Sequence, residues 1–470
     1  MTTKTFRTGA ALLPLVCAAL AGLAPAAAFA QASPEATVRR SIEGAREAAG
    51  AAAPSVPAEM LNLPSGDFEA LMARPDDVAV NFSYALEQIN AGNLDRAASA
   101  LERILLIEPN LPYVRMLYAT VLYRMGNMAE AEQEFRALSG AQLSPEARAQ
   151  VDSYLETIAQ ETKTLKQTAS LSVGVTYDDN RNAFPSGGQT MVLGNRVSVA
   201  GEENGDIGMN LIGTYGFSYD PGSQDVSELW GNFALLVTEQ IEVDRLNVGA
   251  GVAELGLTYV APFAEIRPSI FLEHIVLDGE NYLTTPGVQV QISRQFQPGL
   301  EGYVQARVGQ DYYKNTPADP FNEEKRGLRP QLGVGFNYRP AADLHLAGLY
   351  TFTKKMADED YEAYTGHEVQ LAVTKILPRE MFLTGRALVG VNDHDDNDPF
   401  VSAVTERRDV RTLVGATLGV PFTAFGPMPD EIADLVASFG LEWEQVNSNY
   451  PQYDFGTWRA RALVTKRWEF

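Results

Sequence analysis

Cysteine is almost missing from this chain, with one residue, Cys17, among 470. It lies in an apolar run that follows Lys4 and Arg7 and closes with Ala28-Phe29-Ala30, an A-x-A pattern. This arrangement is typical of a secretory signal peptide, which we predict over residues 1–30. Once that segment is removed, the exported chain can form no disulfide and can carry no thiol chemistry.

Long hydrophobic runs are also scarce. Outside the N-terminus no apolar stretch approaches the ~20 residues that a transmembrane helix needs, and the mean hydropathy is −0.14. A bundle of membrane helices is therefore excluded. Any membrane role has to depend on strands or on surface contact.

Positive charge is in deficit, because 37 Lys and Arg face 60 Asp and Glu, for a net charge of −23. Nucleic acid is excluded as a partner, since phosphate binding needs a basic face. The chain contains no H-E-x-x-H, C-x-x-C, G-x-S-x-G or P-loop motif. We predict that it is not an enzyme and uses no cofactor.

Two histidines have acidic neighbours that a strand-borne hydrolase could use: His274 beside Glu273, and His394 within the acidic stretch 393–398. Such neighbours arise by chance in any barrel. The acidic stretch also alternates oxygen ligands, but it lacks the central glycine and distal glutamate of an EF-hand. We predict no catalytic and no metal site, and we expect a solvated, self-repelling loop there.

A repeat of 34 residues begins at Val78. Two Gly-Asn turns mark it, at Gly92 and Gly126, and several positions match at the same offset. The matched pairs are Tyr84 with Tyr118, Ala85 with Ala119, Ala97 with Ala131, and Leu101 with Phe135. A helix–turn–helix repeat of this length, with small residues where the helices cross, is the tetratricopeptide (TPR) pattern.

The helical region is expected to contain two repeats and a capping helix over residues 144–162, which together make a TPR domain at 78–165. Residues 31–77 are rich in Ala, Pro and Glu and predict a linker with one weak helix. A repeat pair of this kind either docks a peptide or protein in its groove or only orients the next domain. Docking is the interpretation we prefer.

At Thr168 the helical period gives way to alternation of apolar and polar residues, which is the period of a strand. Segments of about ten residues repeat this alternation, the length that a tilted strand needs to cross a bilayer. They include residues 207–219, 269–277, 287–296, 300–313, 328–338, 344–353, 368–376, 380–391, 412–420 and 436–446.

Tight turns alternate with long polar loops between these segments, as in an outer-membrane barrel. Both ends of such a barrel must lie on one side, so the strand number is even. We predict an antiparallel barrel of about 14 strands over residues 167–470, following the TPR domain in a multidomain α plus all-β chain. A soluble β-sandwich is the alternative.

The last segment, ARALVTKRWEF, has an apolar face that ends in Trp468 and Phe470. An aromatic terminus of this kind is common in bacterial outer-membrane proteins, and we expect it to be read by the barrel assembly machinery. The opposite face carries Arg459, Arg461 and Arg467, which we expect to face the lumen. There they would line a passage or, more conservatively, pair with carboxylates of neighbouring strands.

The chain resembles the surface lipoprotein assembly modifiers of Gram-negative outer membranes. The resemblance is carried by SVGVTYDDNRNAFPS, IRPSIFLEHIVLDGENY and the final hairpin EWEQVNSNYPQYDFGTWRARALVTKRWEF, with Ser448-Asn449-Tyr450-Pro451 and Tyr453-Asp454 in its loop. It implies an outer-membrane factor that helps lipoproteins reach the cell surface. The TPR unit would lie in the periplasm and engage a client or a chaperone, and the barrel, in contact with outer-membrane lipid, would act as the conduit.

Two other functions stay open at this point. Exopolysaccharide export porins also join periplasmic TPR repeats to a barrel, although they generally carry long repeat arrays. An uncharacterised porin with a regulatory periplasmic domain is the third possibility.

Overall fold

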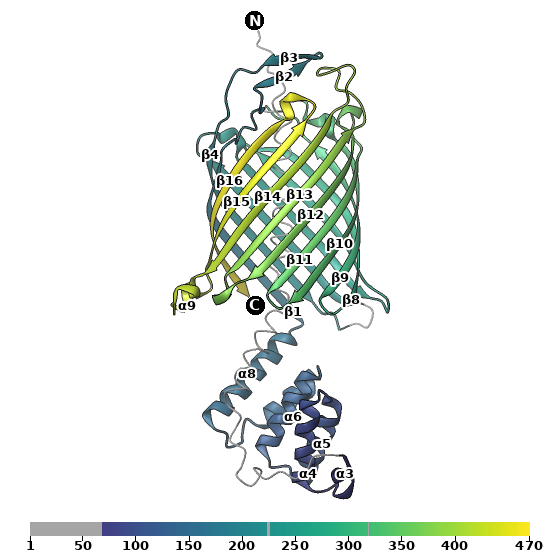
Figure 1. Ribbon diagram of the computed structural model, residues 1–470, viewed down its shortest axis with the longest axis vertical. Helices are drawn as coiled ribbons and strands as arrows, with labels where there is room; N and C mark the ends of the chain where they lie inside the picture. The colour runs from purple at the N-terminus through teal and green to yellow at the C-terminus, as the bar shows by residue number, and fades with distance from the viewer. Residues whose placement is uncertain (1–67, 223–225, 318) are drawn as a thin grey trace. The chain divides into compact units, whose positions relative to one another are not determined.

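The computed structural model describes residues 68–222, 226–317 and 319–470 (Figure 1). The predicted signal peptide, and the predicted linker with its weak helix up to residue 67, lie outside these residues. Contacts along the chain divide it into two compact units, one ending at Lys163 and the other running from Thr164 to Phe470. Each unit is described by itself below.

The first unit is helical. Its elements are α3 (Phe68–Ala73), α4 (Val78–Asn90), α5 (Leu94–Ile107), α6 (Pro112–Arg124), α7 (Met128–Ala137) and α8 (Pro145–Glu161). Helices α4 and α5 form one helix–turn–helix pair, and α6 and α7 form the next. The turns are sharp because Gly92 (φ 80°) and Gly126 (φ 84°) adopt the left-handed conformation that glycine tolerates without strain.

Most of the matched repeat positions form the core of this unit. Seven of the eight matched side chains are at most 6% exposed, and the eighth, Tyr118, is partly buried against both helical cores. Phe135 stacks on Tyr154 of α8 with ring centroids 4.8 Å apart, so the capping helix closes the second pair. The fully or nearly fully buried positions are Tyr84, Ala85, Ala97, Leu101, Ala119, Ala131 and Phe135.

The second unit is a closed antiparallel barrel, which confirms the predicted fold class and the number of 14 strands. Its strands are β1 (Leu165–Asp178), β4 (Asp206–Tyr219), β5 (Val226–Gln240), β6 (Val248–Val260), β7 (Glu265–Leu277), β8 (Glu280–Gln297), β9 (Leu300–Tyr313), β10 (Gly327–Ala341), β11 (Leu344–Lys355), β12 (Tyr364–Ile376), β13 (Phe382–His394), β14 (Arg408–Pro421), β15 (Val436–Ser448) and β16 (Phe455–Glu469). The wall closes where β1 pairs with β16 in continuous register from Thr168↔Glu469 to Asp178↔Arg459.

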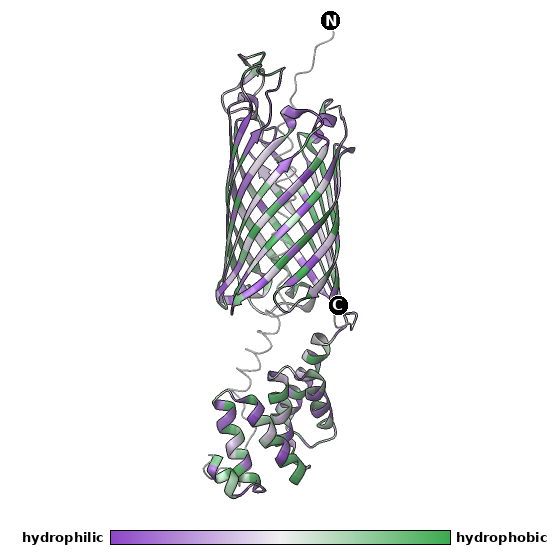
Figure 2. Cartoon of the chain, turned by 90° about the vertical axis from the view of Figure 1, so that its right-hand side faces the viewer, coloured by the Kyte–Doolittle hydropathy of each residue, from purple (hydrophilic) through white to green (hydrophobic). Residues whose placement is uncertain are grey.

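The alternation in the sequence separates two faces of this wall. On β1 the side chains of Leu171, Val173, Val175 and Tyr177 are 41–52% exposed on the outside. The intervening Ser172 faces inward and shares a hydroxyl hydrogen bond of 2.7 Å with Thr465 of β16. Figure 2 shows hydrophobic and hydrophilic residues alternating along the strands. A closed wall with an apolar exterior satisfies its backbone internally and can face lipid.

Short helices and a small hairpin complete the unit. The hairpin β2 (Gln189–Val192) and β3 (Asn195–Ser198) lies in the long connection after β1. The short helices are η3 (Asp244–Leu246), η4 (Asn322–Lys325), η5 (Asp360–Glu362), η6 (Pro378–Glu380), η7 (Phe422–Phe425), α9 (Asp430–Ala433) and η8 (Pro451–Tyr453). No helix among the residues that the structure describes combines the length and the apolarity of a membrane span.

We call the end of the barrel where β1 begins and β16 ends the terminal rim, and the opposite end the loop rim. Connections at the terminal rim are mostly tight, such as 298–299 and 342–343, whereas the loop rim carries 179–205 and 395–407. One long connection, 422–435, lies at the terminal rim, where we expected short turns. It has a partner on the wall, because Lys466 Nζ on the outer face of β16 donates to the Glu431 carbonyl at 2.9 Å.

Candidate functional site

The interior of the barrel carries its charges in two networks. The first spans five adjacent strands, β13 to β16 and β1, and the strand register places five residues opposite one another in succession. That row is Arg386, Gly415, Glu442, Arg459 and Asp178. Because Gly415 has no side chain, the guanidinium of Arg386 reaches across β14 and pairs with Glu442.

Arg459 is the centre of this network. Its Nε lies 2.9 Å from Asp178, and its Nη1 lies 3.0 Å from Glu442 and 2.6 Å from Glu444. Glu444 also accepts from Arg411 at 2.6 Å. Glu444 is 0% exposed and Arg459 only 8%. Buried charges persist only where they are paired, so these contacts tie the closing strands together from inside.

The second network lies across β7 to β11, on the other side of the ring of strands. Its centre is the buried carboxylate of Asp311, which is paired with Arg329 at 3.1 Å and with Lys355 at 2.8 Å. Lys355 reaches it across β10 at Gly327, which stands opposite Asp311 in register. The Gly327 carbonyl also accepts a hydrogen bond of 3.3 Å from Lys355, which holds this cation beside the carboxylate.

Glu273 extends the second network, since it pairs with Arg329 at 3.2 Å and with Arg307. Arg307 lies over the ring of Phe271 at 3.5 Å. The neighbouring His274 is on the opposite face of β7 and bonds Thr284 at 2.9 Å. Adjacent residues of a strand point to opposite faces, so Glu273 and His274 do not form a catalytic pair.

The three arginines that we expected to face the lumen occupy one face of β16, but their surroundings differ. Arg459 is buried in the first network. Arg461 is exposed, and its Nε donates to Thr176 Oγ1 at 3.3 Å. Arg467 stands opposite Ser170 near the terminal rim. Trp468 and Phe470 lie on the outer face, 37% and 58% exposed.

Loops at the loop rim are held to one another. The hairpin turn at Leu193 and Gly194 donates two backbone hydrogen bonds to residues 400 and 401 of the loop 395–407. Arg407 lies over the ring of Tyr453 at 3.4 Å and pairs with Asp409 at 2.6 Å. Burial raises the pKa of Tyr453 to about 12, so its hydroxyl stays neutral at physiological pH. Connections from distant parts of the sequence thus form one structured cap.

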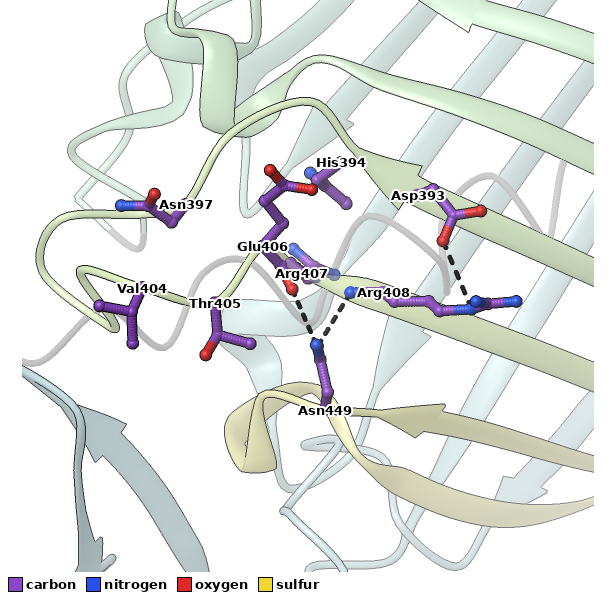
Figure 3. A pocket seen from close by; sticks show the side chains of 9 residues that line it. All are labelled: Asp393, His394, Asn397, Val404, Thr405, Glu406, Arg407, Arg408 and Asn449. Atoms are coloured by element: carbon purple, nitrogen blue, oxygen red, sulfur yellow. Dashed lines mark hydrogen bonds and ion pairs between the residues drawn. The ribbon is translucent and has the colours of Figure 1, made fainter.

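A cavity of about 420 Å³ opens in this cap between the loop 395–407 and Asn449 (Figure 3). Asn449 donates to the Glu406 carbonyl at 2.7 Å and accepts from the Arg408 backbone at 2.9 Å. Figure 3 shows Arg408 turned toward Asp393, with which it forms an ion pair of 3.3 Å. The polar groups labelled in the cavity bond mainly to one another, which favours a structural role.

The expectation of a self-repelling acidic loop at 393–398 is wrong. Asp393 pairs with Arg408, and Asp395 pairs with Lys354 of β11 at 2.6 Å. His394 is buried and contacts the Tyr361 carbonyl through Nδ1 at 2.8 Å. Cations on neighbouring strands thus pair with two of the four aspartates of this stretch, which the sequence order does not reveal. Among residues 68–470, as far as they are described, no three acidic, His or Cys side chains gather in a group suited to a metal ion.

The helical unit offers a second candidate surface. Arg115 of α6 pairs with Glu134 of α7 at 2.5 Å. Partial burial raises the pKa of Tyr118, and the nearby carboxylates of Glu102, Glu134 and Glu130 raise it further. Carboxylates therefore gather around this side chain, although one of them, Glu134, is paired with Arg115.

Sequence reasoning missed most members of the two interior networks, and the missing information is the strand register. The alternation of residues along each strand shows only which side chains face the lumen. Only the register shows that these particular side chains meet across strands. In the sequence Glu273 stands out only as a neighbour of His274, and the members not singled out from the sequence are Asp178, Arg307, Asp311, Arg329, Lys355, Arg386, Arg411, Glu442 and Glu444.

Together, a closed wall, an apolar exterior and a charged interior define the architecture of an outer-membrane β-barrel, and it is joined in one chain to a TPR-type helical unit. A family comparison agrees for the helices, since the tetratricopeptide repeat family matches residues 88–151. No curated protein matches the chain in sequence.

Solved structures similar to the barrel come from bacterial outer membranes. OpdQ of Pseudomonas aeruginosa is 8% identical, with 66% of this chain and 100% of that chain covered and a TM-score of 0.35. The outer membrane protein OprD of the same organism is 8% identical over 65% and 94% of the two chains, with a TM-score of 0.33. OccAB3 of Acinetobacter baumannii is 10% identical over 65% and 99%, with a TM-score of 0.33.

Proposed function

We propose that this protein is an outer-membrane translocation factor that helps lipoproteins or other client proteins reach the cell surface. The observation that carries the proposal is the union, in one chain, of a TPR unit with a barrel whose interior is charged. TPR units are protein-docking scaffolds, and a closed barrel is a route across lipid for polar chains.

The orientation follows from the connectivity. The helical unit leads directly into β1 at the terminal rim, and β16 ends at the same rim. If the chain is exported and then inserted, this rim faces the periplasm and the loop rim faces the medium. The helical unit would meet a client or its chaperone in the periplasm. Trp468 and Phe470 would be read there by the barrel assembly machinery.

The test is surface labelling of lipoproteins in a strain that lacks this gene. We expect at least one lipoprotein to lose its surface label while its total amount in the outer membrane is retained. Restoring the gene should restore the label. If every lipoprotein is labelled as before and a capsule or matrix sugar disappears instead, the proposal is wrong and the polysaccharide export porin replaces it.

A further inference from the structure

One arginine at the first interior network forms no ion pair with the carboxylates of that network. Four of the inward-facing arginines of β13, β14 and β16 gather at this network, and three carboxylates face them. Arg386, Arg411 and Arg459 all form ion pairs with these carboxylates, whereas Arg461 has no carboxylate within the ion-pair distance in the described structure. The carboxylates are those of Asp178, Glu442 and Glu444.

The surroundings of Arg461 keep its guanidinium open. Its neighbour on β1 is Thr176, a short side chain that accepts one hydrogen bond at 3.3 Å. Its neighbour on β15 is Gly440, which offers no side chain at all. Arg461 is exposed although it lies on the inner face of the wall. A guanidinium has five N–H donors, and most of those of Arg461 are therefore available to a solute.

A second guanidinium lies beside it. Arg459 is two positions earlier on the same face of β16, about 7 Å away by the rise of a strand. Its Nη2 is buried and has no hydrogen-bond partner among the residues that the structure describes. Arg386 is the third positive group in electrostatic range of Arg461. The excess charge at this place is positive, in a protein whose net charge is −23.

From these observations we infer that Arg461, with Arg459 and Arg386 behind it, forms an oxyanion-binding site on the inner wall of the barrel. The planar fork of a guanidinium matches the two oxygens of a carboxylate or a phosphoryl group. A carboxylate could come from an acidic segment of a client protein, and a phosphoryl group from a small solute or a lipid headgroup. As a step of transport, this site rests on the proposed function of the barrel as a conduit.

The test measures binding, and not transport, on the full-length protein in detergent. Isothermal titration is carried out with hexaglutamate as the carboxylate probe and with pyrophosphate as the phosphoryl probe. The salt concentration is kept low because dissolved salt screens the attraction between an exposed guanidinium and an anion. We expect saturable binding of at least one probe. Arg461→Gln should weaken it by roughly tenfold or more, the loss of one hydrogen-bonded charge contact.

The matched control is Lys466→Gln, which removes one positive charge from the same strand but from its outer face, and should leave binding unchanged. Gly440→Asp is a second variant. It retains Arg461 but supplies a carboxylate opposite it, and should also weaken binding by roughly tenfold. Unaltered heat-modifiable migration on gels checks that each variant still forms its barrel.

Preference for hexaglutamate assigns the site to acidic protein segments, and preference for pyrophosphate assigns it to phosphorylated solutes. If neither probe binds the unsubstituted protein, or if Arg461→Gln binds as tightly as that protein, the site does not exist. That result would leave the translocation proposal untouched. Conversely, unaltered lipoprotein labelling in the strain that lacks the gene would refute translocation and leave the binding result standing.

Discussion

A chain that lacks residues 78–162 is expected to insert its barrel normally and to lose export of its client completely. The barrel should survive because its wall closes on itself, with β1 paired to β16 and the ion pairs of both interior networks made between strands. The helical unit has separate cores, built on Phe82 and Leu101 in one case and on Phe135 and Tyr154 in the other.

The measurement is surface labelling of the client in the strain that lacks the gene, complemented with the shortened chain. Heat-modifiable migration of the shortened chain is the control for insertion. Export at the level of the full-length protein would show that the helical unit does not dock the client. A barrel that no longer migrates as a folded species would show that the two units depend on each other.

Replacement of Arg459 by methionine should destabilise the barrel by about 3–5 kcal/mol, the usual cost of removing one partner from a buried ion network. The change leaves Asp178, Glu442 and Glu444 buried with less compensation, and Glu444 is 0% exposed. Arg411 still pairs with Glu444 and Arg386 with Glu442, but Asp178 loses its ion pair with Arg459.

The readout is the urea concentration at which half of the detergent-solubilised protein loses its heat-modifiable form. Lys466→Met is the matched control, because it removes the same charge from the outer face of the same strand, where only a backbone carbonyl is bonded. We expect its midpoint to stay close to that of the unsubstituted protein. If the two variants unfold at the same urea concentration, the interior network does not stabilise the closing strands.

The fold could be predicted from the sequence because its signals are local. The 34-residue offset between Gly92 and Gly126 identifies the helical pairs, and the alternation in β1 identifies which side chains face outward. The rule that both ends of a barrel share one side then fixes an even number of strands. The connection 422–435 escaped prediction because it follows no alternation and is held by Lys466, which is distant in sequence.

The interior site could be predicted only in part, because it depends on contacts between strands. The alternation along β16 predicts that Arg459, Arg461 and Arg467 share one face. It does not distinguish the buried Arg459 from the exposed Arg461. Their burial differs because of the residues that face them on β15: Glu442 stands opposite Arg459, and Gly440 stands opposite Arg461. In the same way, two aspartates of the acidic stretch 393–398 pair with Lys354 and Arg408, which only the folded barrel brings close.

The orientation of the chain in the outer membrane is tested most directly by labelling single cysteines. The exported chain is expected to lack cysteine, so a single introduced cysteine reports the side of the membrane on which it lies. Val404→Cys (90% exposed) reports on the cap, and Leu106→Cys (78% exposed) reports on α5 of the helical unit. In intact cells, a membrane-impermeant maleimide should label Val404→Cys, and it should reach Leu106→Cys only after the outer membrane is permeabilised. Labelling of Leu106→Cys in intact cells, or recovery of the folded protein in the periplasm without detergent, would contradict the account.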